Sequence, residues 1–264
     1  MTLTVLTVLI LTLYPLAAWL LGRGVFRPSD ATAIWFAPAA AAVVLHTVFH
    51  VVSWQAVGGL DLHFFAALSL VGLGMAALTT IVGVAGRMQT LGTVAFPLSA
   101  LSFAAYRWAG FAPATEIGWR LQLHAALALL AYATLAIAAL LALMLWAQER
   151  ALRRRDFHAW QRVLPPLTEL ESLLFRTIAV GFILLTATLL TGVLFVDDLL
   201  AQHLVHKTVL SVLSWLAFGA LLFGRWRYGW RGAVAVRWTL VAMALLVLAF
   251  FGSKLVLELV LHYP

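Results

Sequence analysis

Residues 118–135 read GWRLQLHAALALLAYATL and open an apolar run that covers 119–147. This run exceeds the ~20 residues that a helix needs to cross the ~30 Å hydrocarbon core of a bilayer. It is continuous and rich in Leu and Ala, without the period of two that a membrane β-strand shows. The stretch therefore predicts a transmembrane helix, and it raises the question of why Arg120 and His124 lie within its first turns.

The rest of the chain has the same character. Of its 264 residues 64% are hydrophobic and 10% charged, and the mean hydropathy of +1.02 is too high for a water-soluble globule. We expect an all-α polytopic membrane protein, with 1–264 forming one transmembrane domain of eight helices in the lipid bilayer. The apolar runs lie at 3–22, 31–53, 63–85, 91–109, 119–147, 172–196, 207–224 and 233–258.

Basic residues are unevenly distributed between the connections. Of the 17 Arg and Lys residues, 13 lie in or beside the odd-numbered connections and 4 on the opposite side. Because basic residues concentrate on the cytoplasmic side, both termini are expected outside, and the connector at about 148–172 in the cytoplasm. The net charge of +7 is therefore an orientation signal, and no nucleic-acid partner is expected.

The histidines show the opposite asymmetry. On the expected topology, His158 is cytoplasmic, whereas seven of the eight fall in the outer halves of helices or in outer loops. For the loop histidines, this asymmetry is equally well explained by an ordinary role as neutral polar residues in loops that contain few Lys and Arg. The seven are His46, His50, His63, His124, His203, His206 and His262.

His46 and His124 differ from the others because both should lie within hydrocarbon, where a polar ring is costly without a partner. His46 lies about seven residues before the end of its run and His124 about five after the start of its own. Both therefore lie ~7–10 Å below the outer edge. Two imidazoles at matched depth suit the axial ligation of haem iron, and the alternative for each is a structural hydrogen bond.

The expected haem site also has nearby cations. Arg120 lies one helical turn outward from His124 and could meet a haem propionate, as could Arg107, Lys207 or Lys254. The chain contains no cysteine, which excludes a CxxCH attachment site. Any haem would therefore be b-type haem, held non-covalently.

Four stretches resemble the cytochrome c assembly superfamily, in its HemX-like branch. They are LPPLTELESLLFRTIAVGFILLTATLLTG at 164–192, the pattern LxxHxxxxxxAYATL at 121–135, GWRG at 229–232 and FG at 251–252. The resemblance implies an eight-helix, haem-handling protein of the bacterial inner (plasma) membrane, with no catalytic activity of its own. Its implied partners are haem and other membrane proteins, including those of cytochrome c assembly.

The resemblance also implies roles for particular residues. His124 occupies the position of the family's outer haem-ligating histidine, and His262 represents the second one. The family's Trp-rich segment is replaced by VDDLLAQHLVHKTVLSVLSW at 196–215, in which Lys207 and Trp215 are its remnants. This departure argues against haem presentation to apocytochrome and leaves haem binding open.

Two alternatives without haem remain. A small-molecule transporter would show an inverted repeat and helices broken near the midplane, and no paired halves are visible in the sequence. A non-catalytic accessory subunit would need only helix faces, which the sequence supplies. A visible absorption spectrum separates these alternatives from the haem hypothesis, because only haem gives a Soret band.

Overall fold

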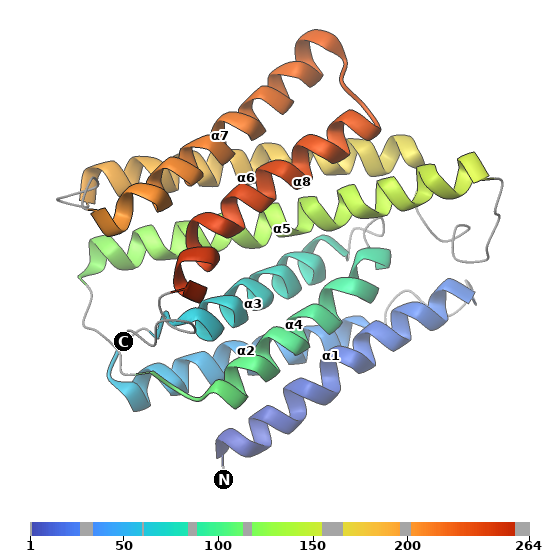
Figure 1. Cartoon of the computed structure of the whole chain (residues 1–264). Coiled ribbons are helices and arrows are strands. Elements are labelled where there is room, and N and C mark those ends of the chain that lie inside the picture. The colour runs from blue at the N-terminus through green and yellow to red at the C-terminus, as the bar shows by residue number, and fades with distance from the viewer. Residues whose placement is uncertain are drawn as a thin grey trace. The chain divides into compact units, whose positions relative to one another are not determined.

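The computed structural model describes residues 2–26, 34–59, 61–83, 89–112, 118–154, 166–195 and 202–256, which are almost entirely helical (Figure 1). The helices fall into two compact units. The first contains the four N-terminal helices and the second contains the rest. The all-α prediction is confirmed, while the single domain predicted over 1–264 stays a prediction because it concerns the assembly of both units.

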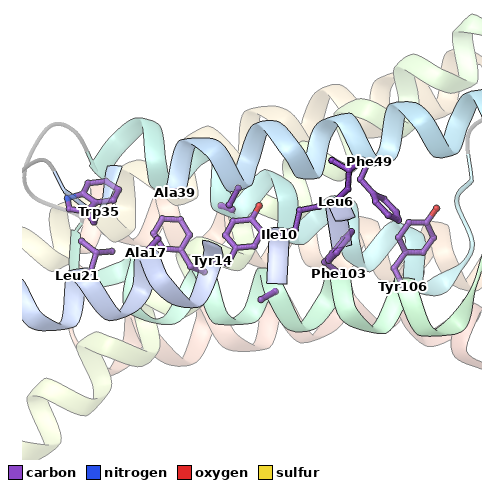
Figure 2. Close-up of a cluster of buried hydrophobic side chains, with 14 of the residues drawn as sticks. Leu6, Ile10, Tyr14, Ala17, Leu21, Trp35, Ala39, Phe49, Phe103 and Tyr106 are labelled. Atoms are coloured by element: carbon purple, nitrogen blue, oxygen red, sulfur yellow. The ribbon is translucent and has the colours of Figure 1, made fainter. Parts of the chain in front are cut away.

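The first unit is built around aromatic side chains. Its helices are α1 (Thr2–Phe26), α2 (Phe36–Val57), α3 (Phe64–Gly83) and α4 (Gln89–Ala109). Figure 2 shows the buried side of α1, whose residues recur at helical spacing against the neighbouring helices: Leu6, Ile10, Tyr14, Ala17 and Leu21. Phe49 of α2 packs edge-on against Phe103 of α4, with ring centroids 4.8 Å apart.

The fourth helix is less apolar than the others. Seven helices among the described residues are long and apolar enough to cross a membrane, and α4 is the one that does not qualify. Its polar residues face inward: Ser99 Oγ donates to the Gly72 carbonyl of α3 at 2.7 Å. The low hydropathy of α4 therefore reflects polar groups used inside the bundle, and the predicted count of eight spans stays a prediction.

The second unit holds the remaining helices. They are α5 (Trp119–Arg154), α6 (Leu167–Phe195), α7 (Gln202–Tyr228) and α8 (Ala233–Val247), followed by the π-helical turn η2 (Leu248–Gly252). α6 lies alongside α5 (Figure 1). Their close approach needs Gly181, because a Cβ there would lie 2.5 Å from Leu135 Cδ2.

Helix ends differ from the apolar runs. α5 continues to Arg154 and α6 starts at Leu167, so both ends of the connector predicted at 148–172 are helical. Charged and polar residues such as Glu149 and Arg150 form helices as readily as leucine does. A hydropathy run marks where a helix is apolar, and the helix itself extends beyond that run.

Candidate functional site

His124 lies half-buried on α5, on the face that contacts α6. Its Nδ1 atom is 3.1 Å from Thr191 Oγ1 of α6. The Thr191 hydroxyl can donate its hydrogen to the carbonyl oxygen of Ala187 or of Thr188, each 2.9 Å from Oγ1. With its hydrogen on either carbonyl, the hydroxyl oxygen accepts from His124 Nδ1.

This geometry favours one tautomer of His124. With the Thr191 hydrogen on a carbonyl of its own helix, Nδ1 carries the ring hydrogen and Nε2 keeps its lone pair. A metal-binding imidazole shows the same arrangement, in which one nitrogen donates to an oxygen and the other binds the metal. His124 is thus held in the form that can ligate iron.

Two further features surround His124. A Cβ at Gly192 of α6 would lie 3.3 Å from His124 Cε1, so the glycine leaves room for the imidazole. Arg120 lies one turn towards the start of α5, exposed, with its guanidinium carbon 5.7 Å from the centroid of the Trp119 ring and 6.0 Å from that of Phe195. A cation and a ligand-competent imidazole therefore share one face of α5.

His46 is fully buried in the first unit, and both of its ring nitrogens are engaged. Nδ1 lies 3.1 Å from the Tyr14 hydroxyl, and Nε2 lies 2.9 Å from Ser69 Oγ. Ser69 Oγ also lies 3.0 Å from His50 Nε2. We call these four residues, Tyr14, His46, Ser69 and His50, the imidazole chain.

Donors and acceptors balance along the imidazole chain. The Tyr14 hydroxyl donates to His46 Nδ1, His46 Nε2 donates to Ser69, and the Ser69 hydroxyl donates to His50 Nε2. In this direction the buried Tyr14 hydrogen has an acceptor. His46 then keeps no unused lone pair, so binding iron there would require one of these hydrogen bonds to be replaced.

The distances along the helices also bear on the predicted pairing of His46 with His124. α2 runs to Val57, which places His46 eleven residues from its end rather than seven, while His124 is five residues from the start of α5. At 1.5 Å per residue these distances are about 16 Å and about 8 Å. The two histidines belong to different units, and their pairing across one haem stays a prediction.

A second polar cluster, Asp61, His63 and Tyr106, lies beyond the imidazole chain in the first unit. Asp61 Oδ1 is 2.6 Å from His63 Nδ1, and Asp61 Oδ2 accepts from the Tyr106 hydroxyl at 3.4 Å. The Tyr106 ring stacks on His50, with centroids 5.2 Å apart and planes at 5°. Figure 2 shows Tyr106 and its hydroxyl at one end of the aromatic core.

Asp61 is a buried carboxyl whose negative charge is stabilised by several neighbouring groups. Burial alone would raise its pKa. Hydrogen bonds from the His63 side chain and backbone, the His63 charge and the Ala112 N–H outweigh burial, so the pKa of Asp61 falls below its usual value. The sequence pattern did not predict four of these residues, Asp61, Tyr14, Ser69 and Tyr106, although each is a polar residue within or beside an apolar helix, which is a signal that could have singled it out.

The remaining predicted residues lie on α4, on α7, near the end of the described chain or outside the described residues. Lys207 is half-buried on α7, and Lys254 Nζ lies 5.6 Å from the centroid of the Phe250 ring. Arg107 is in the last turn of α4, with its Nε buried. His262 lies outside the described residues. Within the described part of the chain, no group of three or more His, Cys, Asp or Glu residues could hold a metal ion by itself.

The stretches that carry the family resemblance contact one another in the second unit. The Tyr132 hydroxyl of α5 donates to the Leu246 carbonyl of α8, and its ring meets Phe251 edge-on at 5.6 Å between centroids. Glu171 Oε1 of α6 accepts from the Gly232 N–H at 2.7 Å, which ties the 164–192 stretch to the GWRG turn. The motif residues thus hold α5, α6 and α8 together.

Comparison with known proteins agrees with this arrangement. The family model described as cytochrome C assembly protein matches residues 32–261, most of the chain. The chain belongs to the cytochrome c assembly protein family. The HemX-like resemblance seen in the sequence is thereby confirmed.

Relatives of this cytochrome c assembly family protein cover much of its length. The inner membrane protein YpjD of Escherichia coli (strain K12) is 32% identical over 234 residues, covering 86% of this chain and 89% of YpjD. The cytochrome c biogenesis protein CcsA of Parasynechococcus marenigrum is 27% identical over 66% of this chain and 65% of CcsA. Protein HemX of Brevibacillus brevis is 25% identical over 76% of this chain and 69% of HemX.

No solved structure matches this family member. Its helices and its relatives together make it a multi-span protein of the bacterial inner membrane, as the sequence predicted.

Proposed function

We propose that this family member is a haem-handling accessory or biogenesis factor that binds b-type haem non-covalently through His124. The observation that carries the proposal is the hydrogen bond between His124 Nδ1 and Thr191 Oγ1 of α6, which favours the tautomer whose Nε2 lone pair remains for iron.

Arg120 supports the same proposal. A haem propionate needs a cation near the headgroup level while the porphyrin stays in hydrocarbon, and Arg120 is exposed one turn outward from His124. Haem would supply the iron to be ligated and carried. The protein's own part is to orient the imidazole, to pair the propionate and to exclude water from the ring.

His46 is proposed as the opposite ligand, with Lys207 and His262 near the outer edge of the site. For His46 the proposal requires that iron take the place of the Tyr14 or Ser69 hydrogen bond. Variants of His46 and His124 therefore test different parts of the proposal.

The test is the visible spectrum of protein purified from haem-replete cells. The wild type should show a Soret band, and His124→Gly should lose it and regain it when free imidazole is added. Recovery by imidazole separates ligation from folding, because imidazole supplies the missing ligand without repairing a misfolded helix. His46→Ala should convert a six-coordinate spectrum to a five-coordinate one.

His158→Ala is the control, since His158 is predicted on the cytoplasmic side. Haem-free wild-type protein, or spectra unaffected by all of these substitutions, would contradict the proposal.

A second candidate function is a membrane accessory subunit that binds no haem. The balanced imidazole chain favours it, because there His46 is satisfied by Tyr14 and Ser69 without any ligand. On this alternative no Soret band appears, and His46→Ala destabilises the first unit without a spectral effect.

A further inference from the structure

A cavity of about 540 Å³ lies in the second unit between the last turns of α5 and the first turns of α8. It lies towards the opposite end of α5 from His124, since its lining residues on that helix are 19 to 30 residues further along the chain. The cavity therefore belongs to neither the proposed haem site nor the imidazole chain.

One end of the cavity is strongly basic. The cavity is lined by one acidic residue, Glu149, and by four arginines: Arg150, Arg153, Arg154 and Arg237. All four arginines are exposed, and none has a carboxylate partner within 4.0 Å among the residues that the structure describes. Guanidinium groups without acidic partners suit a phosphate, which they can bind with paired hydrogen bonds.

The other end of the cavity is apolar. Leu143 of α5 and Leu240 of α8 line it, Trp146 lies one turn from Leu143 towards the arginines of α5, and Val236 lies beside Arg237. The Arg150 guanidinium carbon lies 5.4 Å from the centroid of the Trp146 ring, an aromatic and cationic pair typical of the membrane interface. The cavity thus spans the level at which the apolar run of α5 ends and its charged extension begins.

A ligand for this cavity needs an anionic head and an apolar tail at the same depth. A soluble phosphate would leave the apolar walls without contact, and haem would find no iron ligand because the described lining residues include no His, Met, Cys or Tyr. We propose that the cavity binds an anionic phospholipid, with its phosphate on the arginines and an acyl chain along Leu143, Val236 and Leu240.

The bound lipid would join α5 to α8 at the end where the two helices carry like charges. Arg153 and Arg237 line the same cavity, so their like charges are unfavourable together, and a phosphate bound there would offset both. The 13-to-4 bias in basic residues predicts that this end is cytoplasmic, so the lipid would come from the inner leaflet.

The test uses the full-length protein, delipidated in detergent and titrated with phosphatidylglycerol or phosphatidylcholine, with bound lipid counted by native mass spectrometry. We expect phosphatidylglycerol to bind at least about tenfold more tightly than phosphatidylcholine. The double variant Arg153→Gln/Arg237→Gln should lose that preference.

The matched control is Arg176→Gln/Arg227→Gln, which removes the same charge from exposed arginines of the same unit outside the cavity lining. It should keep the preference. Equal losses in both double variants would show that only overall charge attracts the lipid, and would overturn the proposal.

Two further experiments identify the ligand and separate loss of the site from misfolding of the variant. Inorganic phosphate at millimolar concentration should not displace phosphatidylglycerol, and displacement would indicate a site for free anions instead. Leu240→Trp keeps every charge and fills the apolar end, so it should weaken lipid binding severalfold. If Leu240→Trp binds lipid like the wild type, or if haem competes with the lipid, the proposal is wrong.

Discussion

At the residue scale, the environments of the two intramembrane histidines lead to different expectations. His124 is hydrogen-bonded at Nδ1 to Thr191, which leaves Nε2 with its lone pair when Nδ1 is the donor, whereas His46 is engaged at both nitrogens within the imidazole chain. The same residue type in two apolar helices therefore supports ligation in one place and internal hydrogen bonding in the other. Their neighbours, rather than their depth in the helix, make the difference.

Thr191→Val should weaken haem binding without removing the ligand. The valine cannot accept from Nδ1, so the ring loses the partner that holds its tautomer, and loss of such a partner costs about 10- to 100-fold in metal affinity. Haem retention during gel filtration, followed by the Soret absorbance, measures the effect. Thr177→Val is the control, because Thr177 donates only to a carbonyl of its own helix, and equal effects from both variants would contradict the prediction.

Asp61 should make stability depend on acidic pH. Its pKa is lowered in the folded state, so its contribution is present above the usual value of 3.8 and is lost as pH falls through the folded pKa. The melting temperature of the wild type should therefore drop below about pH 4. At pH 7, Asp61→Asn should lower the free energy of unfolding by about 1–3 kcal/mol, and with it the melting temperature, because an amide cannot accept from every donor that faces the carboxylate.

The comparison of the two melting curves against pH tests this account. In Asp61→Asn the contribution from this carboxyl is absent, so the difference between wild type and variant should shrink as the pH falls below 4. A difference that is constant from pH 7 to pH 3 would show that Asp61 is not the titrating group.

At the element scale, the turn between α7 and α8 depends on two glycines with left-handed backbone, Gly229 at φ 66° and Gly232 at φ 52°. Gly232 also lies against Glu149, whose Oε1 would be 2.6 Å from an added Cβ, while the space around Gly229 is open. The Gly232 N–H donates to Glu171. The GWRG turn is therefore the point where α5, α6 and α8 meet.

Gly232→Ala should destabilise the protein more than Gly229→Ala. Both substitutions place a side chain at positive φ, which costs about 1–2 kcal/mol in the left-handed region. Gly232→Ala also displaces Glu149 and must adopt a ψ of −128°, which residues with a Cβ rarely combine with positive φ. Thermal unfolding in detergent measures the difference, and Gly229→Ala is the matched control. Equal melting temperatures for the two variants would show that Glu149 moves aside freely.

At the scale of the whole molecule, the distribution of basic residues predicts that both termini face away from the cytoplasm. A reporter that is active only in the cytoplasm should give no signal when fused after Pro264, and full signal when inserted near residue 160 in the connector. A strong signal from the fusion at Pro264 would reverse the predicted orientation, and with it the leaflet assigned to the lipid cavity.

The sequence by itself determined the features that depend on local composition. Hydropathy predicted a helical membrane protein, and the stretches at 121–135 and 164–192 indicated its family. Hydropathy also singled out His46 and His124 as polar residues in apolar runs. It could not place the ends of α5 and α6, because charged residues continue a helix after it has left the hydrocarbon.

Only the tertiary structure decided which polar groups meet. His124 and Thr191 are 67 positions apart, and Tyr132 and Leu246 are 114 apart, so no local pattern pairs them. In an apolar interior each buried donor must find an acceptor, and helix packing determines which acceptor is within reach. For that reason the tautomer of His124, the balanced imidazole chain and the basic cavity between α5 and α8 follow from the fold and not from the sequence pattern.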